Sequence, residues 1–509
     1  MQDNILELGR RISIRDCMDV IKGRKIITFS DDYKKRVQRA EEVLQQWIDE
    51  GKVIYGVTTG FGSLSTRNIS HQEMEQLQEN ILLSHAVSVG DLLSRESVRA
   101  IMLSVLQNLG YGVSGVRLEL LERYRMILNS EFTPWAPGSG SVGYLAVEAH
   151  IALPLIGKGK LIGPQGIVST AEGLQQIGLE KMKLRAKEGL ALISGTTSPT
   201  GLSVLATWYA KQALDVANCI AAMELEVSGG NISAYGPELS QVRPRTSQRE
   251  VAQIIRNILK DSSLIGTAGR VQDALSLRCA AQLHGTVKEA VSQAGRIVEE
   301  EINACCDNPI VWTEPGREEV ISGGNPDSSY IGWSMDSLAI GVTMLAKMSE
   351  RRTNRLLDEN LSGKPAFLIS NPGVNSGLMI TQYTQAGLLN EMRVLAYPAT
   401  VDNTPTCANQ EDYVAMGYVA AHKALTLVEK LEYILAIELL AVYQAYYFVD
   451  RQKMSKTTKL VFERMREVVP ALEKDEYIHP YIEIIKNMIH EGVIIDILKK
   501  EDYNREIIM

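Results

Sequence analysis

The sequence predicts a mainly α-helical protein, and three observations support this fold class. Phe, Trp and Tyr together make up only 6% of the 509 residues. Runs of β-branched residues are short, and apolar residues recur at the spacing of three and four that buries one face of a helix. Several predicted helices exceed the usual length of about 10–14 residues, which is typical of helices in a bundle, often one shared between subunits.

Four amphipathic helices and one loop are expected in the N-terminal part. The helices are predicted over residues 31–52, 71–87, 94–109 and 116–128. The first is expected to be capped at Ser30 or Asp31, because a side-chain oxygen there can accept the free N–H groups of the first turn. Between the first two helices, the glycines and threonines of YGVTTGFGSLS, residues 55–65, indicate a flexible loop.

The rest of the chain is also predicted to be helical, with a few breaks. Helices are expected over residues 199–225, 249–259, 274–303, 327–358, 382–395 and 410–449. A short strand is expected over 159–164, a loop over 229–245, and a turn-rich segment over 307–324 with a hairpin at Pro315-Gly316. The more charged stretch from Lys453 onward predicts a peripheral helical cap.

Composition argues against several classes of protein. The net charge is −8 without a basic block, which argues against nucleic-acid binding. The six cysteines form no C-x-x-C pair, and no cluster of His, Cys and Asp has metal-ligand spacing, so no metal site and a reduced, cytoplasmic protein are expected. The polar N-terminus predicts no signal peptide. The uncharged run 189–210 is long enough for a membrane span, but its Gly, Ser, Thr and Pro content favours a buried core helix.

The stretch PGSGSVGYLAVEAH, residues 137–150, runs from small residues directly into an apolar helix. Its glycines spell G-x-G-x-x-G, but the prolines of the preceding EFTPWAP argue against the strand that a dinucleotide fingerprint requires. A tight backbone beside a ligand, facing the free N–H groups of the helix, is the better interpretation. Residues 189–202, GLALISGTTSPTGL, are also small, apolar and uncharged and lead into a helix. We therefore expect a buried site that is covered by the N-termini of two helices.

Two side chains in the first part of the chain could carry chemistry. Tyr55 lies in the glycine-flanked loop, where it could close over a substrate and carry a proton, or simply be a packed aromatic residue. His85 follows Ser84 at the end of an apolar helical run. It is either a core histidine or a contact for a polar substrate side chain.

Two further candidates lie in the second half. Arg278, among the apolar residues of VQDALSLRC, needs an anion. This is either a substrate carboxylate held by two hydrogen bonds or a buried acid such as Asp273. Glu411 is predicted in the first turn of a long helix, where acids offset the helix dipole. As a functional group it would be a buried carboxylate facing an amine or imidazole. The residues of the turns around Asn325 and at 373–377 are most simply explained by the backbone geometry of tight turns, without a functional role.

Many motifs in one order match a known family. The chain resembles the histidine, phenylalanine and tyrosine ammonia-lyases and the related aminomutases, and is closest to the histidine enzymes. The matching motifs are YGVTTGFG, LLSHAVSVG, GSVG, GLALISGT, VQDALSLRC, DNPIV, ISGGN, GVNSG and TCANQEDYVAMG. The resemblance implies a nearly all-α homotetramer with a central helical bundle and active sites completed by more than one subunit. We expect an N-terminal active-site domain over 1–200, the central bundle over 201–452 and a C-terminal cap over 453–509.

The family uses an electrophile made from its own backbone, and this chain departs from the pattern at that place. An Ala-Ser-Gly tripeptide, which follows GSVG and precedes Asp-Leu-Ala, cyclises to a methylidene-imidazolone. Here Gly143 is followed directly by Tyr144, Leu145 and Ala146. Either the tripeptide is fused into one modified residue that the one-letter sequence does not show, so that the methylidene-imidazolone is present, or the protein has no such cofactor.

Other departures favour a real absence. Tyr144 replaces the family's Asp after the tripeptide, and Ser194 replaces the Asn that helps to form and position the electrophile. Leu275 replaces a second tyrosine, and Pro326 replaces an aromatic residue. All four changes fall at positions that surround the electrophile in the family, so together they indicate that the electrophile itself was lost.

The resemblance assigns roles to particular residues. Tyr55 corresponds to the catalytic lid tyrosine, and Arg278 to the residue that grips the substrate carboxylate. Ser84, His85 and Glu411 look like the histidine-lyase versions of the specificity positions, so a small amino acid or related acid with a polar or cationic side chain is expected. The full set comprises catalytic Tyr55, His85, Ser194 and Glu411, substrate-binding Arg278, Gln272, Ser84, Leu275, Pro326 and Asn325, and the electrophile-flanking Gly143 and Tyr144.

Three functions therefore stay open at the level of sequence. The first is an ammonia-lyase that converts an amino acid into an α,β-unsaturated acid. The second is an electrophile-free relative in which Tyr55 performs acid–base chemistry: elimination, isomerisation or cyclisation. The third is a non-catalytic binder of a small acid, or a partner subunit in a mixed tetramer. Neither nucleic acid nor membrane is expected as a partner.

Overall fold

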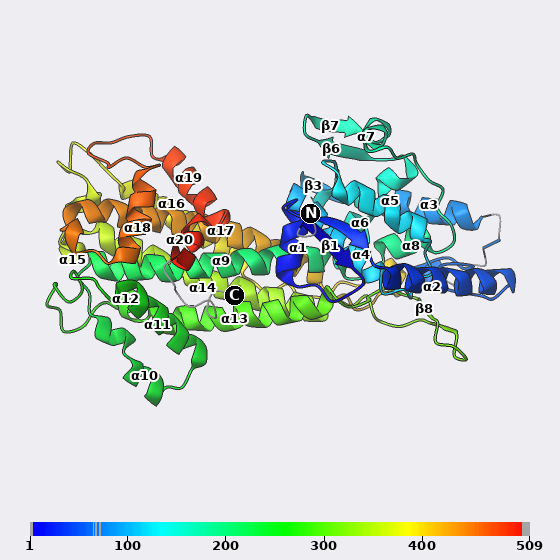
Figure 1. The fold of residues 1–509 in the computed structure, drawn as a ribbon, viewed down its shortest axis with the longest axis horizontal. Helices are drawn as coiled ribbons and strands as arrows, with labels where there is room; N and C mark the ends of the chain where they lie inside the picture. The colour runs from blue at the N-terminus through cyan, green and yellow to red at the C-terminus, as the bar shows by residue number, and fades with distance from the viewer. Residues whose placement is uncertain (1–3, 65, 67–68, 71–72, 501–509) are drawn as a thin grey trace. The chain divides into compact units, whose positions relative to one another are not determined.

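The computed structural model describes residues 4–64, 66, 69–70 and 73–500, and it confirms a mainly α-helical fold (Figure 1). The chain divides into two compact units. The first comprises Met1–Ala206, Ala294–Asp336 and Pro398–His422, and the second Thr207–Gln293, Ser337–Tyr397 and Lys423–Met509. The division into three consecutive domains stays a prediction.

The four helices that were predicted with bounds in the first unit, now α2 to α5, lie close to those bounds, whereas α1, α7 and α8 were not predicted. Helix α2 (Asp31–Asp49) begins as predicted, because the Ser30 hydroxyl accepts the N–H of Tyr33 at 3.1 Å. Ser94 caps α4 in the same way. The helices are α1 (Ile14–Ile21), α2, α3 (Met74–His85), α4 (Arg95–Leu109), α5 (Leu118–Asn129), α6 (Ala146–Ala152), α7 (Thr170–Ile177) and α8 (Glu188–Ile193), with 3₁₀ turns at Gly62–Leu64, Leu153–Ile156 and Cys407–Asn409.

The strands of the first unit are short and form four small sheets. β1 (Ile5–Leu8) pairs with β2 (Ile26–Phe29) in parallel, and β3 (Val89–Leu92) pairs antiparallel with β5 (Pro137–Ser139). A three-stranded sheet has the order β4 (Thr133–Pro134), β6 (Lys160–Gly163) and β7 (Gly166–Ser169), and β8 (Ile310–Trp312) pairs with β9 (Glu319–Ile321). The strand over 159–164 and the hairpin at Pro315-Gly316 are thereby confirmed. Pro134 lies in an edge strand, where its missing N–H is tolerated.

Close packing of α3, α6 and α8 ties the Tyr55 loop to the rest of this unit. A Cβ atom at Gly189 of α8 would lie 2.2 Å from the carbonyl oxygen of Gln78 in α3, so only glycine allows this approach. The buried Gln78 side chain accepts the N–H of Leu190 at 3.0 Å and donates to the carbonyl of Gly56 at 3.2 Å. Gln78 therefore fixes the loop directly after Tyr55.

Long helices dominate the second unit. Its core draws on α9 (Thr197–Val227), α13 (Ala280–Glu301), α14 (Ser329–Leu357) and α17 (Gly417–Ala445), which continue from the first unit. The other helices are α10 (Pro237–Val242), α11 (Thr246–Leu259), α12 (Leu275–Arg278), α15 (Glu359–Ser362), α16 (Met379–Leu395), α18 (Lys456–Arg466), α19 (His479–His490) and α20 (Val493–Lys500), with 3₁₀ turns at Ile232–Tyr235, Ala366–Leu368, Tyr446–Phe448 and Arg451–Lys453. The helical nature of the stretch after Lys453 is confirmed.

Three helix predictions need correction. The predicted helix over 274–303 is broken at Cys279, where φ is −100°. The Tyr235 hydroxyl donates to the carbonyl of Leu277 and so takes an acceptor that a continuous helix would use. The predicted loop over 229–245 contains α10, which starts with Pro237 at a position that favours proline. The predicted helix over 410–449 begins only at Gly417.

The uncharged run 189–210 is buried inside the protein, in α8 and the start of α9, apart from Trp208, which is partly covered. Throughout the described ranges, none of the helices is both long enough and apolar enough to cross a membrane.

Candidate active site

The loop that carries Tyr55 is closed by a hydrogen bond from its own backbone. The N–H of Gly62 donates to the Tyr55 hydroxyl oxygen at 3.0 Å, and the Tyr55 side chain is half-buried. Gly62 has a φ of +51°, and a Cβ there would lie 2.4 Å from Sγ of Cys407. The Tyr55 loop therefore packs against the segment that precedes Glu411. Residue 65, the end of the predicted loop, lies outside the described residues.

Glu411 lies in a loop and not in the first turn of a helix, so that prediction is wrong. Residues 411–416 lie outside any helix, and Met416, directly before α17, has a positive φ of 53°, which no α-helix allows. The three residues before Gln410, which are Cys407, Ala408 and Asn409, also have positive φ values. Thr406 and Glu411 instead pair across the loop: the Thr406 N–H donates to the Glu411 carbonyl at 2.8 Å, and its hydroxyl donates to Glu411 Oε2 at 3.3 Å. The loop thus holds one carboxylate oxygen and leaves the other for a further contact.

His85 is the last residue of α3, and its ring nitrogen Nδ1 lies 3.0 Å from the Ser84 hydroxyl. Burial lowers the pKa of His85, while the Glu411 carboxylate acts in the opposite direction. The imidazole is therefore held neutral and within electrostatic reach of Glu411. A neutral imidazole beside a carboxylate suits a polar or cationic group better than an apolar one.

Tyr144 joins this group. Its side chain is half-buried, and burial raises the pKa of its phenol above the ordinary value, with further contributions from Glu411 and then Tyr55. The turn that carries it is anchored on the Glu411 side. Gly143 lies against the Ser328 hydroxyl, which in turn fills the space beside Gly417. Tyr55, His85, Tyr144 and Glu411 therefore belong to one site in the first unit.

The backbone next to Tyr144 is strained. Leu145, directly before α6, has φ 86° and ψ −65°, the rare form of a γ-turn. Such a conformation costs about 1–3 kcal/mol for a non-glycine residue and persists only where its surroundings impose it, commonly at functional sites. The Ser141 hydroxyl donates to the Tyr144 carbonyl at 3.3 Å and closes this turn.

Ser194 supports a neighbouring loop. Its hydroxyl accepts the N–H of Asn308 at 3.2 Å, and the Asn308 side-chain oxygen accepts the N–H of Gly323 at 2.8 Å. This connection fixes the ISGGN loop, in which Asn325 is exposed and Pro326 half-buried. Ser194 therefore acts on the loop backbone, a role that the family motif did not indicate.

Glu148 is a buried group that the sequence interpretation missed. Its Oε1 accepts the N–H of Ser198 at 2.9 Å and the hydroxyl of Thr197 at 3.2 Å, so it caps the start of α9. Burial raises the pKa of Glu148 to about 7. The sequence predicted a ligand at the N-terminus of α9. The Glu148 side chain of α6 accepts the hydrogen bonds there instead. The only signal was one acid within the apolar run AVEAHIA.

Gln272, Leu275 and Arg278 belong to the second unit. Nη1 of Arg278 is buried and has no hydrogen-bond partner among the described residues. The alternative that Arg278 pairs with Asp273 is wrong, because Asp273 binds Arg270 at 2.8 Å and the N–H of Asn231 at 2.6 Å. Gln272 is exposed, and Leu275 is 62% exposed. Arg278 therefore presents a buried donor without an anion.

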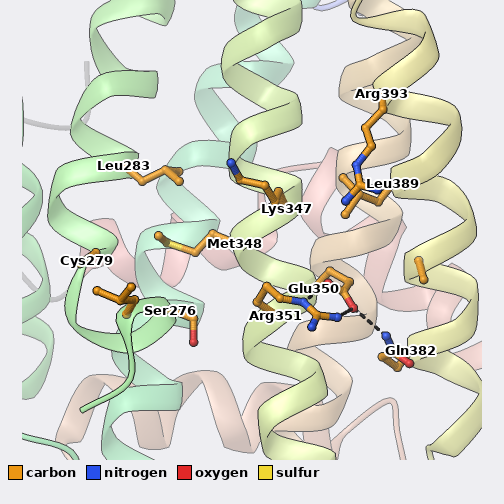
Figure 2. Close-up of a pocket in the computed structure, with 12 residues that line it drawn as sticks. Ser276, Cys279, Leu283, Lys347, Met348, Glu350, Arg351, Gln382, Leu389 and Arg393 are labelled. Atoms are coloured by element: carbon orange, nitrogen blue, oxygen red, sulfur yellow. Dashed lines mark hydrogen bonds and ion pairs between the residues drawn. The ribbon is translucent and has the colours of Figure 1, made fainter. Parts of the chain in front are cut away.

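A hollow of about 700 Å³ lies beside α12 in the second unit (Figure 2). Its lining includes the apolar Leu283, Met348 and Leu389, and the basic Lys347 and Arg393 line it from two different helices, α14 and α16. Also in the lining, Glu350 accepts hydrogen bonds from Arg351 and from Gln382, the latter at 2.6 Å. No sequence pattern indicated this hollow, because its residues come from α12, α13, α14 and α16, which span more than 100 residues of the chain.

Comparisons with known proteins agree with this geometry. The sequence profile of a family described as aromatic amino acid lyase matches residues 12–467. A histidine ammonia-lyase of Symbiobacterium thermophilum is 40% identical over 495 residues, which cover 96% of this chain and 97% of the relative.

Solved structures give the same picture. A histidine ammonia-lyase from Trypanosoma cruzi matches with a TM-score of 0.92 at 33% identity and covers 99% of this chain and 96% of that one. A tyrosine aminomutase from Streptomyces globisporus matches with a TM-score of 0.93 at 30% identity, covering 98% and 100%. The predicted fold and the family resemblance are thereby confirmed.

Proposed function

Because the chain belongs to the aromatic amino acid lyase family, we propose that it is a carbon–nitrogen lyase acting on an amino acid with a polar, histidine-like side chain. It eliminates the amino group and yields an α,β-unsaturated acid. One observation carries the choice of substrate: the carboxylate of Glu411 lies in a loop that packs, through Cys407, against Gly62 of the Tyr55 loop.

Tyr55 is the proposed base for the β-proton of the substrate. The Gly62 N–H at 3.0 Å from its oxygen stabilises negative charge on that oxygen. The close approach of Gly62 to Cys407 brings the Tyr55 loop against the Glu411 segment, as expected of a loop that closes over a substrate.

Glu411 and His85 are the proposed contacts for the substrate side chain. A carboxylate in this position favours an imidazole or amine, because such a group can donate a charge-assisted hydrogen bond. The Ser84 hydroxyl beside Nδ1 orients the His85 ring, so that its other nitrogen is left for the substrate.

Arg278 is the proposed partner of the substrate carboxylate, supplied by a second copy of the chain. Exposed residues of α16 recur at alternating spacings of three and four, the pattern of a helix that packs against another helix. They are Ile380, Tyr383, Gly387, Asn390, Val394 and, just past the helix end, Tyr397. Four of these side chains are large and more than half exposed. This apolar stripe supports a homo-oligomer, which the family resemblance makes a homotetramer.

Replacing Arg278 with methionine is expected to raise KM at least about 30-fold, since removing one partner of a buried charge pair costs about 2–5 kcal/mol. Arg278→Met and Tyr55→Phe, each expressed alone, should both show almost no activity at low substrate concentration. Co-expressing the two chains should restore activity, up to about a quarter of the wild-type rate, if each site combines residues of two copies. Mixed oligomers without any recovery would contradict a shared site.

The function is tested directly by incubating the protein with L-histidine and, for comparison, with L-phenylalanine and L-tyrosine. The expected result is release of ammonia together with the absorbance of a conjugated acid, with histidine preferred. Glu411→Gln should reduce that preference. Protein that binds histidine without consuming any of these amino acids would point to the non-catalytic alternative.

The family's methylidene-imidazolone does not fit the residues present here. Its place between Gly143 and the start of α6 is occupied by Tyr144 and the strained Leu145, and Ser194 is engaged with the Asn308 backbone. No step above is therefore assigned to that group. A cytoplasmic location is also proposed, since all six cysteines are free thiols, as expected in a reducing compartment.

A further inference from the structure

The segment between β5 and α6 contains no precursor for a backbone electrophile. Ala-Ser-Gly occurs nowhere in the 509 residues. The nearest serine followed by glycine is Ser139, preceded by Gly138, and Ser139 lies in β5 opposite Val89 of β3. Cyclisation of a tripeptide needs a tight turn that brings its first carbonyl and last nitrogen together. An extended, paired strand holds these atoms apart.

The chain instead holds Tyr144 at this place by contacts on both sides. The Ser141 hydroxyl binds the Tyr144 carbonyl, and Gly143 rests against the buried Ser328. Ser329, the next residue, lies 2.6 Å from the hydroxyl of Tyr413 in the segment after Glu411. The strained turn, the start of α14 and the Glu411 loop are therefore joined, and the Tyr55 loop meets the same segment where Gly62 approaches Cys407. The Tyr144 phenol is half-buried in this part of the first unit.

We infer that this protein has no backbone-derived electrophile and that the Tyr144 phenol takes its place as a second catalytic group, which donates a proton to the departing amino group. This inference rests on the proposed function. It assigns the two phenols of the site opposite tasks: Tyr55 accepts a proton from carbon, and Tyr144 gives one to nitrogen.

The proton balance of this step is complete without any further reagent. The Tyr55 phenolate takes the β-proton, and the electron pair of that C–H bond forms the double bond between Cα and Cβ. The C–N bond breaks, its electron pair stays on nitrogen, and the Tyr144 O–H proton converts the neutral amino group into ammonia. Tyr55 is then protonated and Tyr144 ionised, so one proton passing from Tyr55 to Tyr144 restores the site.

The environment of Tyr144 supports this direction of transfer. Burial and the acids Glu411, Glu148 and Asp327 all disfavour the ionised phenol, so Tyr144 is protonated before the reaction and regains its proton afterwards. An amine departs more easily when it receives a proton as the bond breaks. The missing electrophile would otherwise have to supply this assistance.

Tyr144→Phe tests the proposed donor with two substrates that share the histidine side chain. One carries a free α-amino group, and the other carries an α-trimethylammonium group, which leaves as neutral trimethylamine and needs no proton. Tyr144→Phe is expected to lower kcat for the amino substrate by about 10²–10⁴-fold, the usual contribution of a general acid, and to leave the trimethylammonium substrate within about threefold. Tyr55→Phe should lower kcat for both substrates by about 10²–10⁴-fold, and the substitution Tyr111→Phe at an exposed position should affect neither.

An equal loss on both substrates, or no loss on the amino substrate, would overturn the role of Tyr144. The first half of the inference is tested on the wild-type protein alone. Its intact mass should equal that of the 509-residue chain as printed, and a mass higher by one additional fused residue between Gly143 and Tyr144 would show that a ring is present. Failure of the wild-type protein to release amine from any substrate would refute the proposed function instead, while the mass still decides whether a ring exists.

Discussion

Replacing Tyr55 with phenylalanine is expected to lower kcat by about 10²–10⁴-fold, because no other group described in the site is placed to remove the β-proton. The ring remains and only the oxygen is lost, so the loop should keep its packing against Cys407. Substrate affinity should therefore stay within about threefold. The measurements are steady-state kinetics and calorimetric binding of the amino acid to the variant.

Tyr111→Phe is a matched control, since Tyr111 lies in the same unit and is exposed. If Tyr55→Phe keeps its full rate, Tyr55 is a packed loop aromatic and the proposed mechanism fails. If both rate and binding disappear while the protein stays folded, the hydroxyl positions the loop through Gly62 and does not act as the base.

The largest expected effect on stability lies in the second unit, at a charged network with no access to water. Arg352 is 0% exposed and binds both carboxylate oxygens of Glu438, one of them at 3.1 Å. Its Nε also lies 3.7 Å from Glu224, and His284 is 3.3 Å from Nη1. Two carboxyl groups thus share one cation, and burial together with the Glu438 charge raises the pKa of Glu224 well above its usual value.

Glu438→Gln is expected to lower the free energy of unfolding by about 3–5 kcal/mol, because it leaves the Arg352 charge buried without its partner. Glu224→Gln is a substitution of the same size, but it should not lower stability at neutral pH and is expected to raise it, because a glutamine needs no proton to be neutral in the folded protein, whereas the raised pKa of Glu224 makes the folded protein take one up. Urea unfolding of both variants, followed by circular dichroism, measures the difference. Equal losses in the two variants would show that the carboxylates share the charge evenly.

The same network predicts the direction of a pH effect. The unfolded chain releases the Glu224 proton above its ordinary pKa of about 4.5, whereas the folded protein retains it. The contribution of this group to stability therefore declines as the pH rises from that value through the raised pKa of the folded state, with a slope of at most about 1.4 kcal/mol per pH unit. Glu224→Gln should remove this part of the slope between pH 5 and pH 8, roughly the range in which folded proteins are usually most stable.

Local signals account for the elements that were predicted correctly. The Ser30 hydroxyl caps α2 with partners three residues away, and Pro315-Gly316 turns β8 into β9 within a few residues. Predictions failed where a distant side chain decided the backbone. Tyr235 breaks the helix at Cys279 from about 40 residues away in sequence. The left-handed residues before Gln410 are held in a loop that packs against Gly62.

The amino-acid sequence by itself determined the mainly helical fold, the family and the missing tripeptide after Gly143, because these follow from periodicity and from contiguous motifs. Only the tertiary structure decided how the site is built. It placed Glu411 in a loop that packs against the Tyr55 loop, capped α9 with Glu148, left Nη1 of Arg278 without a partner among the described residues and held Tyr144 in a strained turn. Burial and hydrogen bonds between residues far apart in the chain produce these features, and no local pattern contains them.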